Sequence, residues 1–280
     1  MSIFDKNGIM QTDDYLMFNA EELDKAMAYT RQKFPNHAKI GISSEDYRQK
    51  YDIDFEELTA NFPKMTHLWV SCQLSDATQV NPLYGLQKLV FLQWWTKTPF
   101  HLAHFPHLEG LACAFPDEIT LESQALKELI ISDCKNLSFV EKLPNLQRLE
   151  LRTYKGADLQ GLEIAKELTH LKINGARKLA QWSSLKACKS LKVIELESVS
   201  EVDTSAFAGT NISELYLHLS ISDCGFVRQM KHLTTFLCKE VKDNDLSPLF
   251  TSETLKNAYF YKHKKSYNYS QSAFEERFSW

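Results

Sequence analysis

Ten apolar triplets of the form L-x-x-L-x-L constrain the fold of this chain more than any other feature of its sequence. The triplets begin at Met65, Leu86, Leu108, Leu126, Leu146, Leu168, Leu191, Ile212, Leu233 and Leu255. Successive triplets start 18 to 23 residues apart. Repetition at such a period is typical of a repeat architecture, in which each turn is one structural unit stacked on the next.

The spacing within each triplet predicts a strand. The last two residues of a triplet lie two positions apart, so on a strand they share one face. One turn of about 20 residues cannot bury that face alone. Stacked turns pair their strands in parallel and join their triplets into one core. The remaining half of each turn leaves room for a 3₁₀ turn or a short helix.

The best-formed turn has Leu126, Leu129 and Ile131 as its triplet, followed by Cys134. From Met65 to Tyr261 the chain resembles the leucine-rich repeat family in its short form of about 22 residues. The resemblance implies an α/β fold, a leucine-rich repeat solenoid (horseshoe) with a parallel, concave β-sheet. The family usually places Asn or Cys three residues after the triplet, and here only Cys134 matches, so we expect an irregular solenoid.

We expect three parts: an N-terminal helical cap over residues 1–62, a solenoid of about ten repeats over 63–262 and a C-terminal cap over 263–280. Asn19 and Glu22 form a helix-capping pattern, and a second helix is expected over 44–51 or 55–62. A separate small helical domain is the alternative for residues 1–62. In the C-terminal cap, Phe274, Phe278 and Trp280 are expected to cover the last strand, whose edge would otherwise be bare.

Composition favours a globular chain with neither a membrane span nor a disulfide framework. The formal net charge is −4, no apolar run reaches the length of a bilayer span, and the N-terminus has no apolar export signal. These features predict a soluble, cytoplasmic protein. The six cysteines form no CxxC pair. The repeat places Cys113, Cys134 and Cys238 in the core, whereas Cys72 falls one residue early and is expected to be exposed.

No nucleotide-binding or hydrolase motif is present, and we predict neither catalysis, nor a metal site, nor a cofactor. Evenly spaced His101, His104 and His107 are a candidate zinc set, but Pro106 breaks a regular helix there, and solvated or packed histidines are the expected state. The basic and aromatic segment from Tyr261 to Tyr269 is a candidate nucleic-acid site; the acidic balance of the chain favours a solvated cap edge instead.

The residues between the leucines are predicted to line the concave face and to bind a partner protein, because aromatic and arginine side chains are frequent anchors of protein interfaces. The predicted partner-binding residues are His67, Trp69, Val90, Leu92, Ile130, Arg148, Glu150, Arg152, His170, Lys172, Glu195, Glu197, Tyr216, His218, Lys239, Tyr259 and Tyr261.

The family resemblance adds a more specific expectation. Free-standing proteins of this kind are often bacterial, and some are inhibitors or immunity proteins that neutralise a toxin. Two alternatives stay open. The chain is an adaptor that recruits a second protein through residues 1–62, or it is an enzyme with an unrecognised site, for instance around the histidine run.

Overall fold

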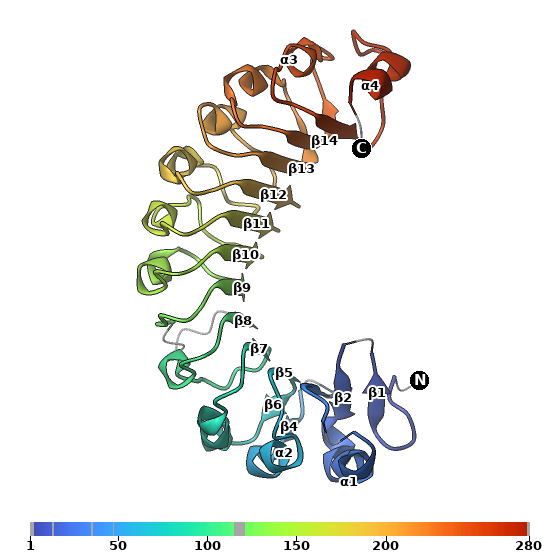
Figure 1. Ribbon diagram of the computed structural model, residues 1–280, viewed down its shortest axis with the longest axis vertical. Coiled ribbons are helices and arrows are strands. Elements are labelled where there is room, and N and C mark those ends of the chain that lie inside the picture. Colours follow the sequence, from blue (N-terminus) through green and yellow to red (C-terminus); the bar gives the residue numbers. More distant parts are fainter. Residues whose placement is uncertain (1–2, 13, 35, 47, 115–120, 279–280) are drawn as a thin grey trace. The chain divides into compact units, whose positions relative to one another are not determined.

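The computed structural model describes residues 3–12, 14–34, 36–46, 48–114 and 121–278. Trp280, assigned above to the C-terminal cap, lies outside the described residues. The chain forms two compact units, Met1–Ile130 and Ile131–Trp280, which are described separately. Each has the architecture of a leucine-rich repeat solenoid, as predicted: one strand per turn, parallel neighbours in sequence order, and short helices on one side of the strands (Figure 1).

In the first unit the sheet begins earlier than predicted. Its strands are β1 (Ile9–Gln11), β2 (Leu16–Asn19), β3 (Lys39–Ser43), β5 (His67–Ser71), β7 (Phe91–Trp94) and β8 (Gly110–Ala114). Strand β2 pairs in parallel with β3, and β3 with β5, whereas β1 pairs antiparallel with β2. A short parallel pair, β4 (Lys50–Tyr51) and β6 (Gln73–Leu74), lies outside this sheet. Strand β9 (Glu128–Ser132) contains the boundary between the units.

Residues 1–62 are therefore not purely helical. They contain α1 (Leu23–Lys33) and α2 (Phe55–Asn61), and they also supply two strands of the parallel sheet. The side chain of Asn19 accepts a hydrogen bond from the N–H of Glu21, which begins a 3₁₀ turn, η1 (Ala20–Glu22), ahead of α1. The remaining helices of this unit are η2 (Ala77–Gly85) and η3 (Leu102–His104).

The predicted register is wrong by three residues at β7, and this odd shift exchanges the two faces of the strand. Leu92 and Trp94 are 1% exposed and face the core, whereas Phe91 and Gln93 are half-buried on the other side. The core triplet of this turn is thus Leu89, Leu92 and Trp94 rather than Leu86, Leu89 and Phe91. The predicted triplet, with Leu86 and Phe91, fits the apolar template as well as the observed triplet does. The periodicity of the sequence therefore does not distinguish the two registers.

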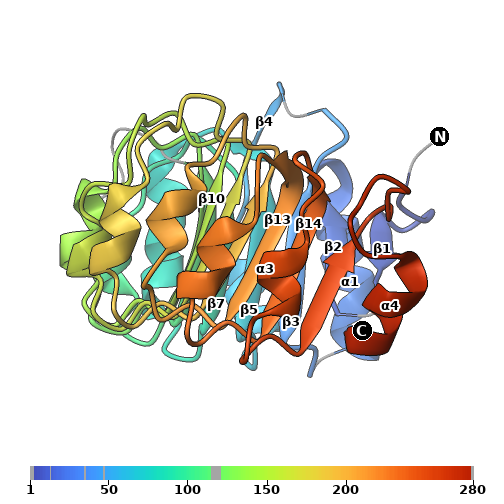
Figure 2. The same cartoon turned by 90° about the horizontal axis from the view of Figure 1, so that it is seen from above.

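In the second unit the strands are β10 (Arg148–Arg152), β11 (His170–Asn174), β12 (Val193–Glu197), β13 (Glu214–Ile221), β14 (Thr235–Val241) and β15 (Asn257–Phe260). Each pairs in parallel with the next, and the predicted leucine positions are aligned in register. The returning segments are η4 (Ser138–Lys142), η5 (Leu162–Ile164), η6 (Ser183–Ala187), η7 (Thr204–Phe207), η8 (Gly225–Gln229) and α3 (Ser247–Phe250). Figure 2 shows these helices stacked along one side of the strands.

Several strands of the second unit end in the same left-handed turn. The residue two positions after the last core side chain has a positive φ: 66° at Asp133, 46° at Thr153, 79° at Gly175 and 53° at Ser198. The first three donate their backbone N–H to the carbonyls of Arg152, Asn174 and Glu197 on the following strand, at 2.7–3.0 Å. This backbone ladder holds the strand ends together where the family's asparagine ladder is missing.

Replacing Gly175 by Ala should lower the free energy of unfolding by about 1 kcal/mol, because a left-handed backbone is strained for residues with a Cβ. The added Cβ would lie 3.4 Å from the backbone of Thr153, an ordinary contact, so the cost is conformational. Gly85→Ala is the matched control, since its Cβ would meet nothing within 4 Å and its φ is not positive. Equal urea denaturation midpoints for the two variants would contradict this account.

The described cysteines lie inside the protein as free thiols, in agreement with the prediction for Cys113, Cys134 and Cys238. Cys72 was predicted to be exposed, and this is wrong: its exposed fraction is 0%. Leu68, Val70, Cys72 and Leu74 are all buried, and Cys72 lies at a bend of the chain between β5 and β6.

The C-terminal helix α4 (Gln271–Arg277) covers part of the core end of the second unit. Phe274 and Phe278 are buried. The ring of Phe274 lies 5.0 Å from that of Phe260 in β15, and the ring of Phe278 lies 5.4 Å from that of Phe250 in α3. Aromatic contacts thus anchor the C-terminal segment to β15 and α3.

Candidate functional site

The open face is the side of the strands that faces away from the helices of the same unit. In the first unit it carries His67, Trp69 and Ile130, all half-buried. Val90 was also predicted to lie here and is 37% exposed, but it precedes β7 and is not one of the alternating positions of this face. Leu92 was predicted to belong here and does not, because the register at β7 turns it into the core. Phe91 and Gln93 take the positions beside His67 and Trp69.

An aromatic cluster covers this part of the open face. Tyr15, from the turn between β1 and β2, packs edge-on against Trp69 at 5.8 Å and against His67 at 6.4 Å between ring centroids. His67 stacks on Phe91 at 5.9 Å. Burial and then the charge of Lys39 lower the pKa of His67, which favours the uncharged imidazole at neutral pH. Tyr15 was missed because the repeat pattern does not reveal the β1–β2 hairpin.

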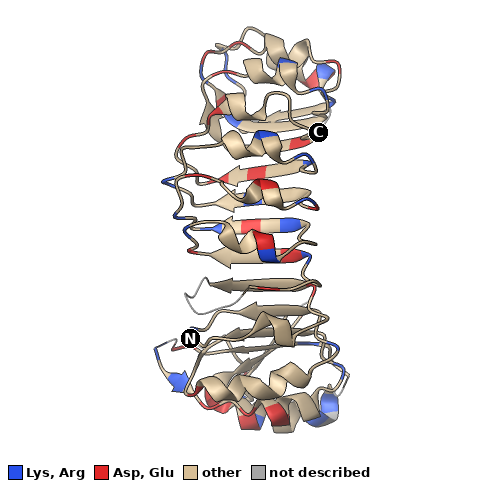
Figure 3. Ribbon diagram, turned by 90° about the vertical axis from the view of Figure 1, so that its left-hand side faces the viewer, with Lys and Arg blue, Asp and Glu red and all other residues tan. Residues whose placement is uncertain are grey.

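In the second unit the open face forms continuous rows across the strands. The central row, in register, is Glu150, Lys172, Glu195, Tyr216, Leu237 and Tyr259. One flanking row starts with Arg148, His170, Val193 and Glu214, and the other with Arg152, Asn174 and Glu197. Figure 3 shows the acidic and basic residues interleaved on these strands. The sequence thus brought the predicted residues of β10 to β13 to the same face.

Ion pairs and a contact of His218 with a carboxylate connect the side chains of these rows. Nζ of Lys172 lies 2.8 Å from Oε1 of Glu195, and Nε2 of His218 lies 3.4 Å from the same oxygen. Nε of Arg152 lies 2.7 Å from Oε1 of Glu150. The hydrogen bond to Glu195 raises the pKa of Lys172. This network restricts the conformational freedom of the central side chains.

The last strands present an aromatic surface. Leu237 is only 6% exposed although it lies on the open face, between Tyr216 and Tyr259 in the register. Tyr259 and Tyr261 are 36% and 49% exposed, and their ring centroids lie 6.1 Å apart. The hydroxyl of Tyr261 is hydrogen-bonded to Nδ1 of His218. Burial and a 2.7 Å hydrogen bond to Glu214 raise the pKa of Tyr216 to about 12.

Lys239 is exposed, and its neighbourhood differs from the repeat. The register between β13 and β14 shifts between Leu217 and Ser220, so that Ser220 pairs with Glu240. Lys239 lies inside this irregular stretch and not in the regular rows. Its membership of a binding surface therefore remains a prediction.

The histidine run lies in and beside η3, where all three side chains are exposed. The ring centroids of His101 and His104 are 5.6 Å apart, and His104 packs edge-on against Tyr84 at 4.4 Å. No three His, Cys, Asp or Glu side chains converge on a metal-sized site among the described residues. Within those residues, the helices are also too short or too polar to span a membrane.

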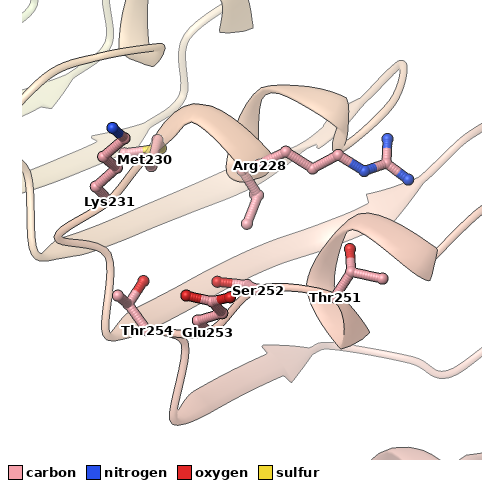
Figure 4. A pocket seen from close by; sticks show the side chains of 8 residues that line it. Arg228, Met230, Lys231, Thr251, Ser252, Glu253 and Thr254 are labelled. Carbon is pink, nitrogen blue, oxygen red and sulfur yellow. The ribbon is translucent and has the colours of Figure 1, made fainter.

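Two cavities lie at the C-terminal end of the second unit. One, of about 720 Å³, is on the helical side and is lined by Val227, Arg228, Met230, Lys231, Thr251, Ser252, Glu253 and Thr254 (Figure 4). Its lining combines one acidic and two basic side chains from successive turns. The other, of about 590 Å³, lies between β15 and α4 and includes Tyr259 and Tyr261 in its lining, so it adjoins the open face.

No family model and no curated protein matches this chain. Among solved structures, it is similar to an internalin (InlF) from Listeria monocytogenes, with 13% identity over 89% of this chain and 87% of that one, at a TM-score of 0.48. It is also similar to the functional domain of InlJ from Listeria monocytogenes, with 15% identity and a TM-score of 0.41. A third is the plant peptide hormone receptor RGFR1, in complex with RGF2, with 14% identity and a TM-score of 0.38.

In the last two comparisons the matched region is 80% of this chain. It spans 53% of the InlJ chain and 43% of the receptor chain. The fold assignment rests on the strands of this chain itself, which follow one another in parallel with one strand per turn. The chain has a leucine-rich repeat fold.

Proposed function

We propose that the chain binds a protein partner through the open face of its second unit. The observation that carries the proposal is the ordered surface on β10 to β15, where an ion-pair network adjoins exposed tyrosines. Tyrosine and arginine side chains that are already held in place lose little conformational entropy on binding, so they are effective interface anchors. The surface extends over Arg148, Glu150, Arg152, His170, Lys172, Glu195, Glu197, Tyr216, His218, Tyr259 and Tyr261.

The charge pattern favours a protein over a nucleic acid. Glu150, Glu195, Glu197 and Glu214 are interleaved with the basic side chains of β10 and β11. Phosphate backbones require a basic surface, and carboxylates at these positions would repel them. A protein surface of mixed charge can match both signs, and such complementarity sets partner choice and orientation.

In its more specific form, the proposal is that the partner is a toxin and that the chain inhibits it by steric blockade. This form rests on the family resemblance, and it predicts that a stoichiometric complex suppresses the partner's activity. An adaptor would instead leave that activity unchanged while holding a second protein.

Changing Tyr216 to Ala should weaken binding of the partner at least tenfold, and Arg152→Glu should do so as well, because both remove anchors from the proposed interface. The partner is first captured with the full-length chain and identified by mass spectrometry, and its dissociation constant is then measured by calorimetry. Lys142→Glu is the matched control, because Lys142 is an exposed residue of η4 on the helical side of the same unit. Equal affinities for all variants would overturn the assignment of the open face.

A further inference from the structure

We infer that the open face of the second unit takes a protein segment with separated charges, its acidic end over β10 and β11 and its basic end over β12 and β13. The surface is the one proposed above, so this inference rests on the proposed function and adds the chemistry and orientation of the partner. A surface with opposite charges at its two ends favours one orientation of a partner over the reverse, because the reverse brings like charges together.

The charges of this face alternate along its central row, but they separate when they are counted strand by strand. The open-face positions of β10 and β11 carry three basic residues and one acidic residue, namely Arg148, Arg152, Lys172 and Glu150. Within the register that pairs β12 with β13, the open-face positions carry no Lys or Arg, and their charged residues are Glu195, Glu197 and Glu214. The net charge of the face therefore changes sign between β11 and β12.

The ion pairs of this face leave charges at its two ends uncompensated. Among the described residues, Arg148 forms no ion pair, and neither does Glu197 or Glu214. Glu197 accepts a hydrogen bond from the amide of Asn174 at 3.3 Å, and Glu214 accepts one from the hydroxyl of Tyr216 at 2.7 Å. These donors are neutral, so the negative charge stays in place and attracts an incoming basic group.

The histidine between the two ends responds to both of them. His170 lies in the same row as Arg148 and Glu214. Burial lowers the pKa of His170, the charge of Arg148 lowers it further, and the charge of Glu214 raises it. At ~4.8 Å per strand, Arg148 on β10 and Glu214 on β13 lie about 14 Å apart. They are too far apart to pair with each other, so a partner can meet each of them separately.

The acidic end adjoins the exposed tyrosines. Burial raises the pKa of Tyr261, and the charge of Glu197 raises it further, so the carboxylate acts on the aromatic surface. An arginine side chain stacks on tyrosine rings and forms paired hydrogen bonds with carboxylates, so arginine is the basic group that we expect at this end. Lys239, on the adjoining strand β14, lies in the irregular stretch outside the regular rows.

The test uses two sixteen-residue, alanine-based helical peptides of identical composition. Each carries two glutamates and two arginines on one face, with the glutamates before the arginines in one peptide and with the two residue types alternating in the other. Both are titrated into the full ¹⁵N-labelled chain at low salt and followed by NMR chemical shifts. The peptide with separated charges should bind at least threefold more tightly, and its affinity should fall as salt is added.

The orientation of the bound peptide is the second measurement. A nitroxide label at the glutamate end should broaden the amide signals of β10 more strongly than those of β14. A fourfold variant that keeps the net charge should reverse this order; its changes are Arg148→Glu, Arg152→Glu, Glu197→Arg and Glu214→Arg. The single variants Arg148→Glu and Glu214→Arg should each weaken the peptide at least threefold, because a like charge then faces one of its ends. Lys186→Glu is the matched control, since Lys186 is exposed in η6 on the helical side, and it should leave binding unchanged.

Equal affinities for the two peptides, equal broadening at both ends, or an orientation that a folded fourfold variant does not reverse would overturn the inference. The absence of binding at low salt would also overturn it, and so would single variants that bind like the parent. The proposed function fails in a different way. If Tyr216→Ala leaves the affinity of the captured partner unchanged, the open face is not the interface. If that affinity falls while the peptides show no preferred orientation, only the inferred polarity is wrong.

Discussion

Raising the pH from about 8 to about 10 in a reducing buffer should lower the free energy of unfolding by several kcal/mol. The cause is the set of buried thiols. An ordinary cysteine titrates near pH 9, but burial raises the pKa of Cys72, Cys134 and Cys224 to about 12 and that of Cys238 well above its ordinary value. Desolvation is the largest cause in each case, because the thiolate cannot be hydrated inside the core.

The direction of the effect follows from proton binding. Above about pH 9 the unfolded chain releases its thiol protons, whereas the folded chain keeps them until about pH 12. The unfolded state therefore binds fewer protons across this window, and stability falls as the pH rises. Each buried thiol contributes on the order of 1 kcal/mol at pH 10. Burial raises the pKa of Tyr154 as well, with the same sign.

Urea denaturation at several pH values measures this effect directly. A triple variant with Cys72, Cys134 and Cys224 changed to Ala is the comparison. It should be less stable than the parent at neutral pH, because it contains small cavities, but its stability should fall much less on going to alkaline pH. An alkaline decline of the same size in both proteins would show that the thiols are not its source.

Changing Trp94 to Ala should lower the free energy of unfolding by about 3–5 kcal/mol, the range for removing a large core aromatic residue. Trp94 is 1% exposed and packs against Phe55 at 6.3 Å and Phe100 at 5.8 Å between ring centroids. Its indole N–H donates to the carbonyl of Thr98 at 2.8 Å. The variant therefore loses packing and leaves a buried carbonyl without that donor.

Trp95→Ala is the matched control, because the neighbouring tryptophan is half-buried. This variant should lose at most about half as much free energy of unfolding as Trp94→Ala, because folding buries less apolar surface of Trp95 than of Trp94. The same urea experiment, followed by circular dichroism so that the signal does not depend on tryptophan, compares the two variants. Comparable losses would argue for the alternative register, in which Phe91 and not Leu92 points into the core.

The repeat pattern was sufficient to predict the fold class and most of the face assignments. In β10 to β13, leucine and isoleucine alternate with polar residues, so a shift of one residue would bury charges such as Arg148 or Glu195. That energetic penalty makes the register readable from the sequence. The proposed interface residues of these strands could be assigned to the open face for the same reason.

At β7 both possible registers would place apolar residues in the core, so the sequence pattern does not indicate which register is adopted. Leu92 and Phe91 are equally acceptable to a hydrophobic template, and only the packing of Trp94 against Phe55 and Phe100 selects one of them. Spacing failed at the N-terminus for a different reason. The turns that begin with β2 and β3 contain α1 and α2, and Ile40 of β3 is aligned with Leu68 of β5, 28 residues later, which exceeds the period of the later turns.

The sequence by itself thus determined the stacking of parallel strands, because apolar triplets at a constant period can be buried only against one another. Tertiary structure decided the features that depend on contacts between distant residues. These are the packing of Tyr15 on Trp69, the burial of Cys72, and the groove that α4 leaves beside β15. Each of these features depends on contacts with segments that do not follow the repeat pattern, so the periodicity of the sequence does not predict it.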